Sequence, residues 1–119
     1  QYPKKYSQDL NRRLKMTEKT KSILTSLGLA KRAGKLAIGT DMACDAVRAG
    51  KAKVGIASSA ASQNSKKRIE NCFSYYGVRL VYIDCTTAEL GAAFGKSEAA
   101  CVAVTDRNLA ELVSGKCER

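Results

Sequence analysis

The residues around Gly39 have the types and spacing needed to bind an anion. Gly39-Thr40 directly precedes an expected helix, whose first N–H groups lack partners within the helix and can meet a phosphate. Lys31, Arg32 and Lys35 precede this loop by a few residues and add positive charge. Asp41, just inside the helix, could accept hydrogen bonds from the N1–H and exocyclic amine of a guanine.

A second stretch has a similar composition. Residues 58–65 (SSAASQNS) are small and hydroxyl-rich, and they lead into a helix that begins with Lys66, Lys67 and Arg68. Together the two stretches predict a surface that binds RNA largely through its phosphates. The plain alternative is two ordinary helix caps beside two solvated basic patches.

Catalytic chemistry is poorly supported. Asp41 and Asp45 have the spacing of a carboxylate pair on one helix face, but an acid near a helix start is more simply a capping or dipole partner. There is no histidine to act as a base or metal ligand, and no CxxC pair to hold zinc. No phosphate-loop, dinucleotide-binding or nucleophile-elbow motif occurs. We therefore expect no enzyme activity, no metal and no cofactor.

The charge balance favours a polyanionic partner. The 119 residues contain 21 Lys and Arg against 11 Asp and Glu, a formal charge of +10. Residues 1–15 account for +4 and lack apolar periodicity, which predicts a basic, mobile extension, either native or an addition to the domain. Residues 16–119 are then one domain with a net charge of +6.

The apolar content is that of an ordinary globular protein. No apolar run approaches the roughly 20 residues that span a bilayer, and no stretch has the order of a secretory signal. The five cysteines are odd in number and mostly have apolar neighbours, so we expect reduced, buried thiols. A cytoplasmic monomer without a membrane partner is the expectation.

The pattern of apolar residues predicts alternating helices and strands. Helices are expected from Thr17 to Gly34, from Gly39 to Gly50, over 62–76, from Thr86 or Thr87 to Phe94, and after Asp106, with Leu109, Leu112 and Val113 inside the last. Extended segments are expected at 36–38, 54–57, 80–83 and 101–104. Short apolar strands that alternate with helices predict a three-layer α/β/α sandwich.

Several of these segments resemble a known family when taken in order. They are Gly34-Lys35, Gly39-Thr40-Asp41, and the stretches 54–57, 89–95 and 99–104. They are similar to the ribosomal-protein superfamily of L7Ae and L30e type, which binds kink-turn RNA. The stretches GLAKRAGKL and ASQNSKKR are most similar to its bacterial YlxQ-type members. The resemblance covers about residues 17–113 and implies a four-stranded mixed sheet between helices.

The resemblance also implies binding to RNA that bends sharply beside tandem sheared G·A pairs. The family's recognition element, Gly-x-Asn-Glu with a later Lys, maps onto Gly39, Asp41, Met42 and Asp45. Asp41 can still accept from guanine, whereas Met42 cannot accept and Asp45 reverses a charge that would face phosphate. In the family the second contact loop is usually apolar, whereas here the corresponding residues are Lys96-Ser97-Glu98. Where the family has acidic residues after the second strand, this chain has Ser58 and Ser59.

The sequence thus predicts a non-catalytic RNA-binding protein associated with the ribosome or translation. Base-edge contacts are assigned to the start of the second helix, phosphate contacts to basic residues beside it, and support of the loop to two alanines. These site residues are Lys31, Arg32, Lys35, Gly39, Thr40, Asp41, Met42, Asp45, Lys96, Ala99 and Ala100. The alternative is a protein–protein adaptor that contacts ribosomal proteins with the same scaffold; an accessory domain of an RNA-modifying enzyme ranks below both.

Overall fold

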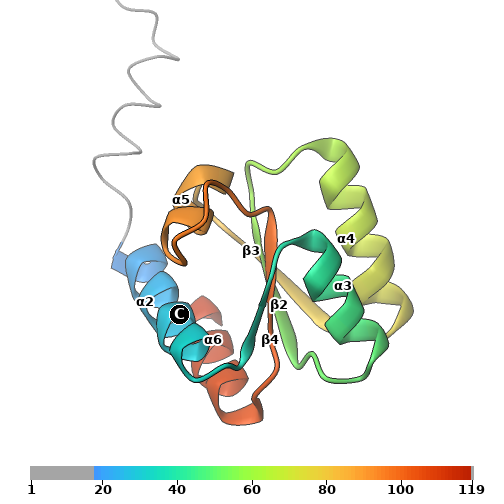
Figure 1. The fold of residues 1–119 in the computed structure, drawn as a ribbon, viewed down its shortest axis with the longest axis horizontal. Helices are drawn as coiled ribbons and strands as arrows, with labels where there is room; N and C mark the ends of the chain where they lie inside the picture. The colour runs from blue at the N-terminus through green and yellow to red at the C-terminus, as the bar shows by residue number, and fades with distance from the viewer. Residues whose placement is uncertain (1–17, 119) are drawn as a thin grey trace, which may run out of the picture.

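A computed structural model describes residues 18–118, which form five helices and four strands (Figure 1). In chain order they are α2 (Glu18–Arg32), β1 (Leu36–Ile38), α3 (Thr40–Arg48), β2 (Val54–Ser58), α4 (Gln63–Tyr75), β3 (Arg79–Ile83), α5 (Thr87–Ala92), β4 (Cys101–Val104) and α6 (Arg107–Glu118). The strands form one mixed sheet in the order β1-β4-β2-β3. Only the β2–β3 pair is parallel, because β4 returns antiparallel between β1 and β2.

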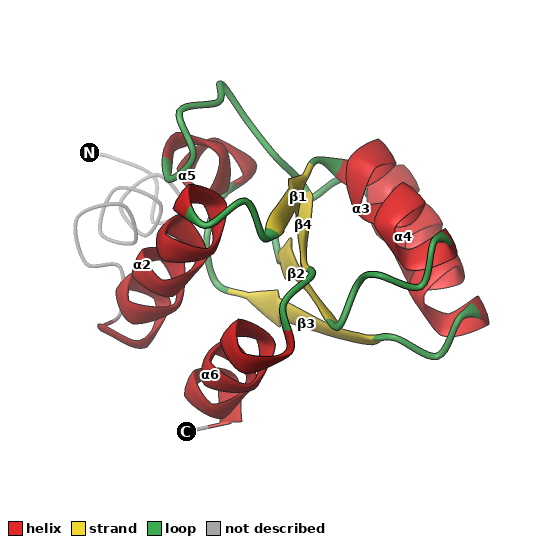
Figure 2. Ribbon diagram, turned by 60° about the horizontal axis from the view of Figure 1, so that its bottom comes forward, coloured by secondary structure: helices red, strands yellow, loops and turns green. Residues whose placement is uncertain are grey.

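The sheet is covered on both sides, which confirms the predicted three-layer sandwich. Figure 2 shows α2, α5 and α6 on one face of the sheet and α3 and α4 on the other. Every residue of β2 and of β4 is buried, as expected for central strands between two helix layers. Two apolar clusters result, one on each face of the sheet.

The layer of α3 and α4 lies close to the sheet because a glycine makes room for it. Phe73 of α4 is fully buried and packs over Gly55 of β2. A Cβ atom at Gly55 would lie only 2.2 Å from the ring of Phe73. The missing side chain therefore sets how closely α4 approaches the sheet.

Local signals fix the ends of several helices, mostly as predicted. Gly34 (φ 72°) ends α2: its N–H donates to the carbonyl of Lys31, and the N–H of Lys35 donates to that of Ala30. Thr86 and Glu89 form a capping box at the start of α5. The carboxylate of Asp106 accepts from the N–H of Leu109 at the start of α6.

One inner-face assignment is wrong. Leu112 is 46% exposed, whereas Ala110 and Val113 are buried, because α6 turns the side that carries Ala110 and Val113 toward the core and Leu112 lies on another side. Thr17 as a cap, the 1–15 extension and the domain start at residue 16 lie outside the described residues. Among the helices described, none is long and apolar enough to cross a membrane.

Candidate nucleic-acid interface

The start of α3 is built on the backbone of Gly39. This residue has φ 98°, a conformation that a side chain would strain, and its N–H donates to the carbonyl of Cys101 at 2.8 Å. Its own carbonyl accepts from Ala43 and begins the helix. No side chain in the described part of the chain caps this helix start. The first-turn N–H groups of α3, from Thr40 to Met42, therefore face outward with the positive end of the helix dipole.

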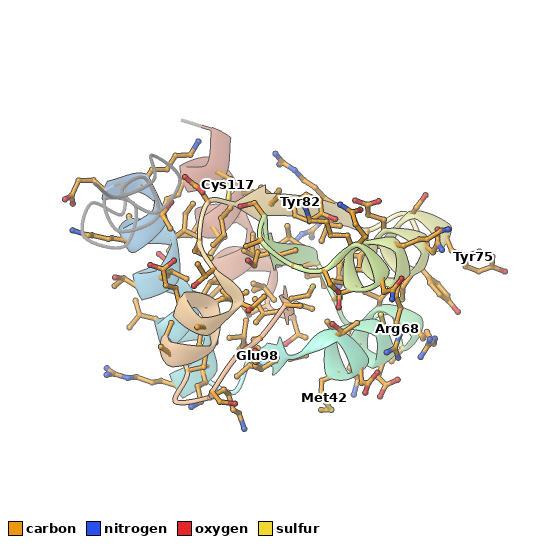
Figure 3. All side chains as sticks on the ribbon, turned by 90° about the horizontal axis from the view of Figure 1, so that it is seen from above. Met42, Arg68, Tyr75, Tyr82, Glu98 and Cys117 are labelled. Carbon is orange, nitrogen blue, oxygen red and sulfur yellow. The ribbon has the colours of Figure 1, made fainter. Side chains whose placement is uncertain are left out.

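The loop between α5 and β4 lies beside this helix start. The bond from Gly39 to Cys101 joins the two, and the preceding residue, Ala100, accepts from the N–H of Ser58. Ala99 is buried and its N–H donates to Thr87, so this alanine anchors the loop rather than forming its surface. Figure 3 shows Glu98 of the loop and Met42 of α3 on the same side of the molecule.

Gly91 holds the loop close to α5. The backbone of Glu98 passes so near that a Cβ atom at Gly91 would lie 2.5 Å from its Cα. Lys96 donates its N–H to the carbonyl of Gly91, while its side chain is exposed. The 89–95 stretch, which carries part of the family resemblance, thus packs a loop onto a helix. The role of Gly91 could not be assigned from sequence, because Glu98 approaches it only in the folded chain.

The C-terminal end of α2 contacts the start of the loop between α5 and β4. Lys31 donates from Nζ to the carbonyl of Phe94 at 2.6 Å, which ties α2 to the start of the loop. A groove of about 580 Å³ separates α2 from the end of α5, with Arg32 and the half-exposed Leu29 on its wall. Lys31 thus contacts the chain two residues before Lys96, and Arg32 lines the groove beside it.

Lys35 is placed differently from the other predicted contacts. Its carbonyl accepts from Thr105 at one end of β1, whereas Gly39 meets Cys101 at the other end. The three residues of β1 separate Lys35 from Gly39, and the four steps along the chain span about 13 Å at the usual rise per residue. The structure therefore groups Lys31 with the loop after α5, and Gly39 with Ala100, while Lys35 lies at the opposite end of the strand.

The two aspartates of α3 do not form a carboxylate pair. Asp41 pairs with Arg68, which reaches across from α4, and Asp45 pairs with Arg48 at 3.1 Å on the same helix. Both carboxylates are mostly exposed, so each pair contributes little stability. Their effect is to neutralise two negative charges on the exposed side of α3. The sequence placed Arg68 in a phosphate patch and gave no sign of this contact.

The hydroxyl-rich stretch is used within the protein. Ser58 is fully buried; its Oγ donates to the carbonyl of Cys85 at 2.6 Å and accepts from the N–H of Ala60. Ser62 caps α4 by accepting from the N–H of Ser65. The hydroxyls of Ser58 and Ser62 are therefore occupied, and the stretch offers less to a phosphate than its composition indicates.

The cysteines are thiols in an apolar setting. Burial raises the pKa of Cys44 and of Cys85 from 9.0 to about 11, and it also raises that of Cys101. A thiol with a raised pKa is a poor nucleophile at neutral pH. Within residues 18–118 no three Cys, Asp or Glu side chains are grouped so as to hold a metal ion.

These thiols predict weaker stability at alkaline pH. Because their pKa is higher in the folded chain than in the unfolded chain, the stabilisation is complete below pH 9 and is lost as the pH rises toward 11. We expect the urea midpoint, followed by circular dichroism under reducing conditions, to fall over this range. Cys85→Ala should make the fall shallower. A midpoint that is constant to pH 11 would contradict the assignment.

Solved structures share this architecture. A protein of unknown function from Bacillus halodurans superposes with a TM-score of 0.75 at 28% sequence identity, covering 82% of this chain and 97% of the other. The Giardia lamblia 15.5kD RNA binding protein superposes with a TM-score of 0.69 at 20% identity, covering 86% and 89%. The class defined by the fold is a compact α/β/α domain. In it, α3 begins at a glycine, Gly39, next to the loop of residues 93–100, which is tethered to α5 by backbone hydrogen bonds.

The family follows from the sequence comparisons. The model of the Ribosomal protein L7Ae/L30e/S12e/Gadd45 family matches residues 21–114, and the chain belongs to this family. It is 36% identical to the RNA-binding protein YlxQ of Bacillus subtilis (strain 168) over 84 residues, 71% of this chain and 83% of that protein. It is 42% identical to the YlxQ protein of Enterococcus faecium over 52 residues, 44% and 50% of the two. The predicted resemblance is confirmed.

Proposed function

We propose that this protein is a non-catalytic RNA-binding protein that holds a structured RNA at the start of α3. The observation that carries the proposal is the uncapped, glycine-started helix beside a tethered loop, with Lys31 and Arg32 next to that loop. Family membership and the names of the YlxQ relatives support it. A cytoplasmic role on the ribosome or in translation belongs to the same proposal.

A kink-turn is the RNA that we propose for this surface. The open N–H groups of α3 would bind a backbone phosphate, and the carboxylate of Asp41 would accept from the edge of a guanine. Met42 is 58% exposed at the same helix start and would contact a base through its apolar surface. Arg68 and Arg48 make this compatible with phosphates nearby, since they neutralise Asp41 and Asp45.

Calorimetry with two RNAs tests the proposal. One RNA carries a kink-turn with tandem sheared G·A pairs, and the control is an unbent duplex of the same length. We expect tighter binding to the kink-turn, with an affinity that falls as salt concentration rises. Equal, weak and strongly salt-dependent binding to both would reject the kink-turn and leave a generic RNA binder.

A second candidate is a protein–protein adaptor. It is favoured by the groove between α2 and α5, where Leu29 is 50% exposed. For an adaptor, reversing the charges of Lys31, Arg32 and Lys35 would leave the amount of RNA that copurifies with the protein unchanged. For an RNA-binding protein, the same change would remove that RNA.

A further inference from the structure

A groove runs between α3 and α4 on the outer side of their layer. The two helices are parallel, since their contacts advance together: Asp41 meets Arg68, and one turn later Cys72 donates from its thiol to the carbonyl of Cys44 at 3.8 Å. The groove continues to Arg48 and to Tyr75 at the helix ends, with a volume of about 340 Å³. It therefore begins at the candidate RNA site and leads away from it.

Two tyrosines lie at the far end of this groove with their rings in solvent. Tyr75 is 82% exposed and Tyr76 is 46% exposed, and their ring centroids are 4.9 Å apart at 68°. Exposed aromatic side chains next to arginines are typical of binding surfaces. Figure 3 shows Met42, Arg68 and Tyr75 in succession along one side of the molecule. Tyr75 and the start of α3 therefore lie on the same side.

The exposed aromatic rings, together with the charge of the surrounding chain, indicate which kind of partner fits. Residues 40–79, which contain α3 and α4, have seven Lys and Arg against three acids. The rest of the described chain has eight against seven. Most of the net positive charge of residues 18–118 thus lies in this part of the chain, although α3 and α4 themselves hold only four Lys and Arg against three acids. A single-stranded nucleic acid has flat, stackable bases that match the exposed aromatic rings, and its phosphates are compatible with the basic residues of this part of the chain.

We propose that the α3–α4 groove binds a single-stranded segment of the RNA that is held at the start of α3, with a base stacked on Tyr75. The inference rests on the proposed function for the identity of the RNA. The seven helical steps from Asp41 to Arg48 rise about 10 Å, so the single strand must extend past the structured element to reach the tyrosines. Asn71 borders the groove and offers an amide to a base edge.

Stacking rather than phosphate binding dominates this contact. Arg48 and Arg68 already pair with Asp45 and Asp41, and the two carboxylates cancel their charge within the groove. Surface ion pairs of this kind are weak, so each arginine can exchange its carboxylate partner for an RNA phosphate with little net change in binding free energy. The contribution of the single strand to affinity should therefore change little with salt, unlike binding of the structured RNA.

The test compares one kink-turn RNA with and without a single-stranded extension of six nucleotides at either end. Affinities are measured by calorimetry for the unchanged protein and for Tyr75→Ala, Tyr75→Phe and Leu112→Ala. Tyr75→Phe keeps the ring, and Leu112→Ala removes an exposed apolar side chain from α6. We expect an extension on one end to tighten binding about tenfold, Tyr75→Ala to abolish that gain, and both controls to keep it.

The outcomes separate this inference from the proposed function. An extension that gives no gain, or a gain that survives Tyr75→Ala, overturns the single-strand site and leaves the tyrosines to a protein partner. If the blunt kink-turn binds in either case, the proposed function is untouched. If only extended RNA binds, and Tyr75→Ala abolishes that binding, the groove is supported and the kink-turn is not.

Discussion

Replacing Gly91 with alanine is expected to destabilise the domain by about 1–3 kcal/mol and to weaken RNA binding as well, a cost typical of overpacking. The added Cβ would lie 2.5 Å from the Cα of Glu98, in backbone that cannot rotate away as a side chain can. Either α5 or the loop must move. Because Lys96 and Ala99 are both bonded to α5 through their N–H groups, the loop beside Gly39 would move with it. Urea unfolding and RNA calorimetry measure the two effects.

Gly115→Ala is the matched control for Gly91→Ala. Gly115 also lies in a helix, α6, and nothing lies within 4 Å of a Cβ built there. Alanine is the better helix former, so this change should stabilise the domain by about 0.5–1 kcal/mol and leave RNA binding unchanged. If Gly91→Ala behaved like Gly115→Ala, the tethered-loop description would be wrong.

Reversing the charge of Arg32 together with Lys96 is expected to lower RNA affinity by two orders of magnitude or more at low salt. Both side chains are exposed, and they lie on either side of the junction that Lys31 makes with Phe94. Each lost phosphate contact should also reduce the slope of log affinity against log salt by about one. The double variant should therefore show a slope shallower by about two in titrations between 50 and 200 mM salt.

A second double variant controls for net charge. Lys21→Glu and Arg107→Glu change the total charge equally, at the opposite end of α2 and at the start of α6. These changes break the exposed pair of Lys21 with Glu18 and alter the long-range field of the protein, but they remove no contact at the proposed surface, so the slope should stay close to that of the unchanged protein. Equal losses in the two double variants would mean that RNA is attracted by net charge rather than held at this surface.

Much of the fold could be predicted from the order of apolar segments. Residues 54–57 and 101–104 are apolar throughout, and both became central strands, while a glycine or a hydroxyl marked the ends of most helices. These signals are local, so a single sequence displays them. The pairing order β1-β4-β2-β3 depends on contacts between distant segments, which a single sequence does not display. The prediction of a four-stranded mixed sheet rests on the family resemblance instead.

The site was less readable because its features depend on contacts between distant segments. Gly39 and Asp41 can be assigned to the candidate site from the sequence, since a helix start is visible there. The partner of Asp41, however, is Arg68, 27 residues away, and the reason for Gly91 is the backbone of Glu98. Ser58 was expected near the surface, but the end of β2 is covered and its hydroxyl is bonded to Cys85. Leu112 likewise has the apolar type of a core residue, but the packing of α6 leaves it exposed.

The most direct test of the central claim, that RNA is held at the start of α3, is a titration of the ¹⁵N-labelled protein with kink-turn RNA, followed by amide chemical shifts. We expect the largest changes at residues 39–42 and 95–100, where open helix N–H groups and the tethered loop meet. The amides of α6 should hardly move. Saturable binding with unchanged amides at residues 39–42 and changes centred on another face would contradict it.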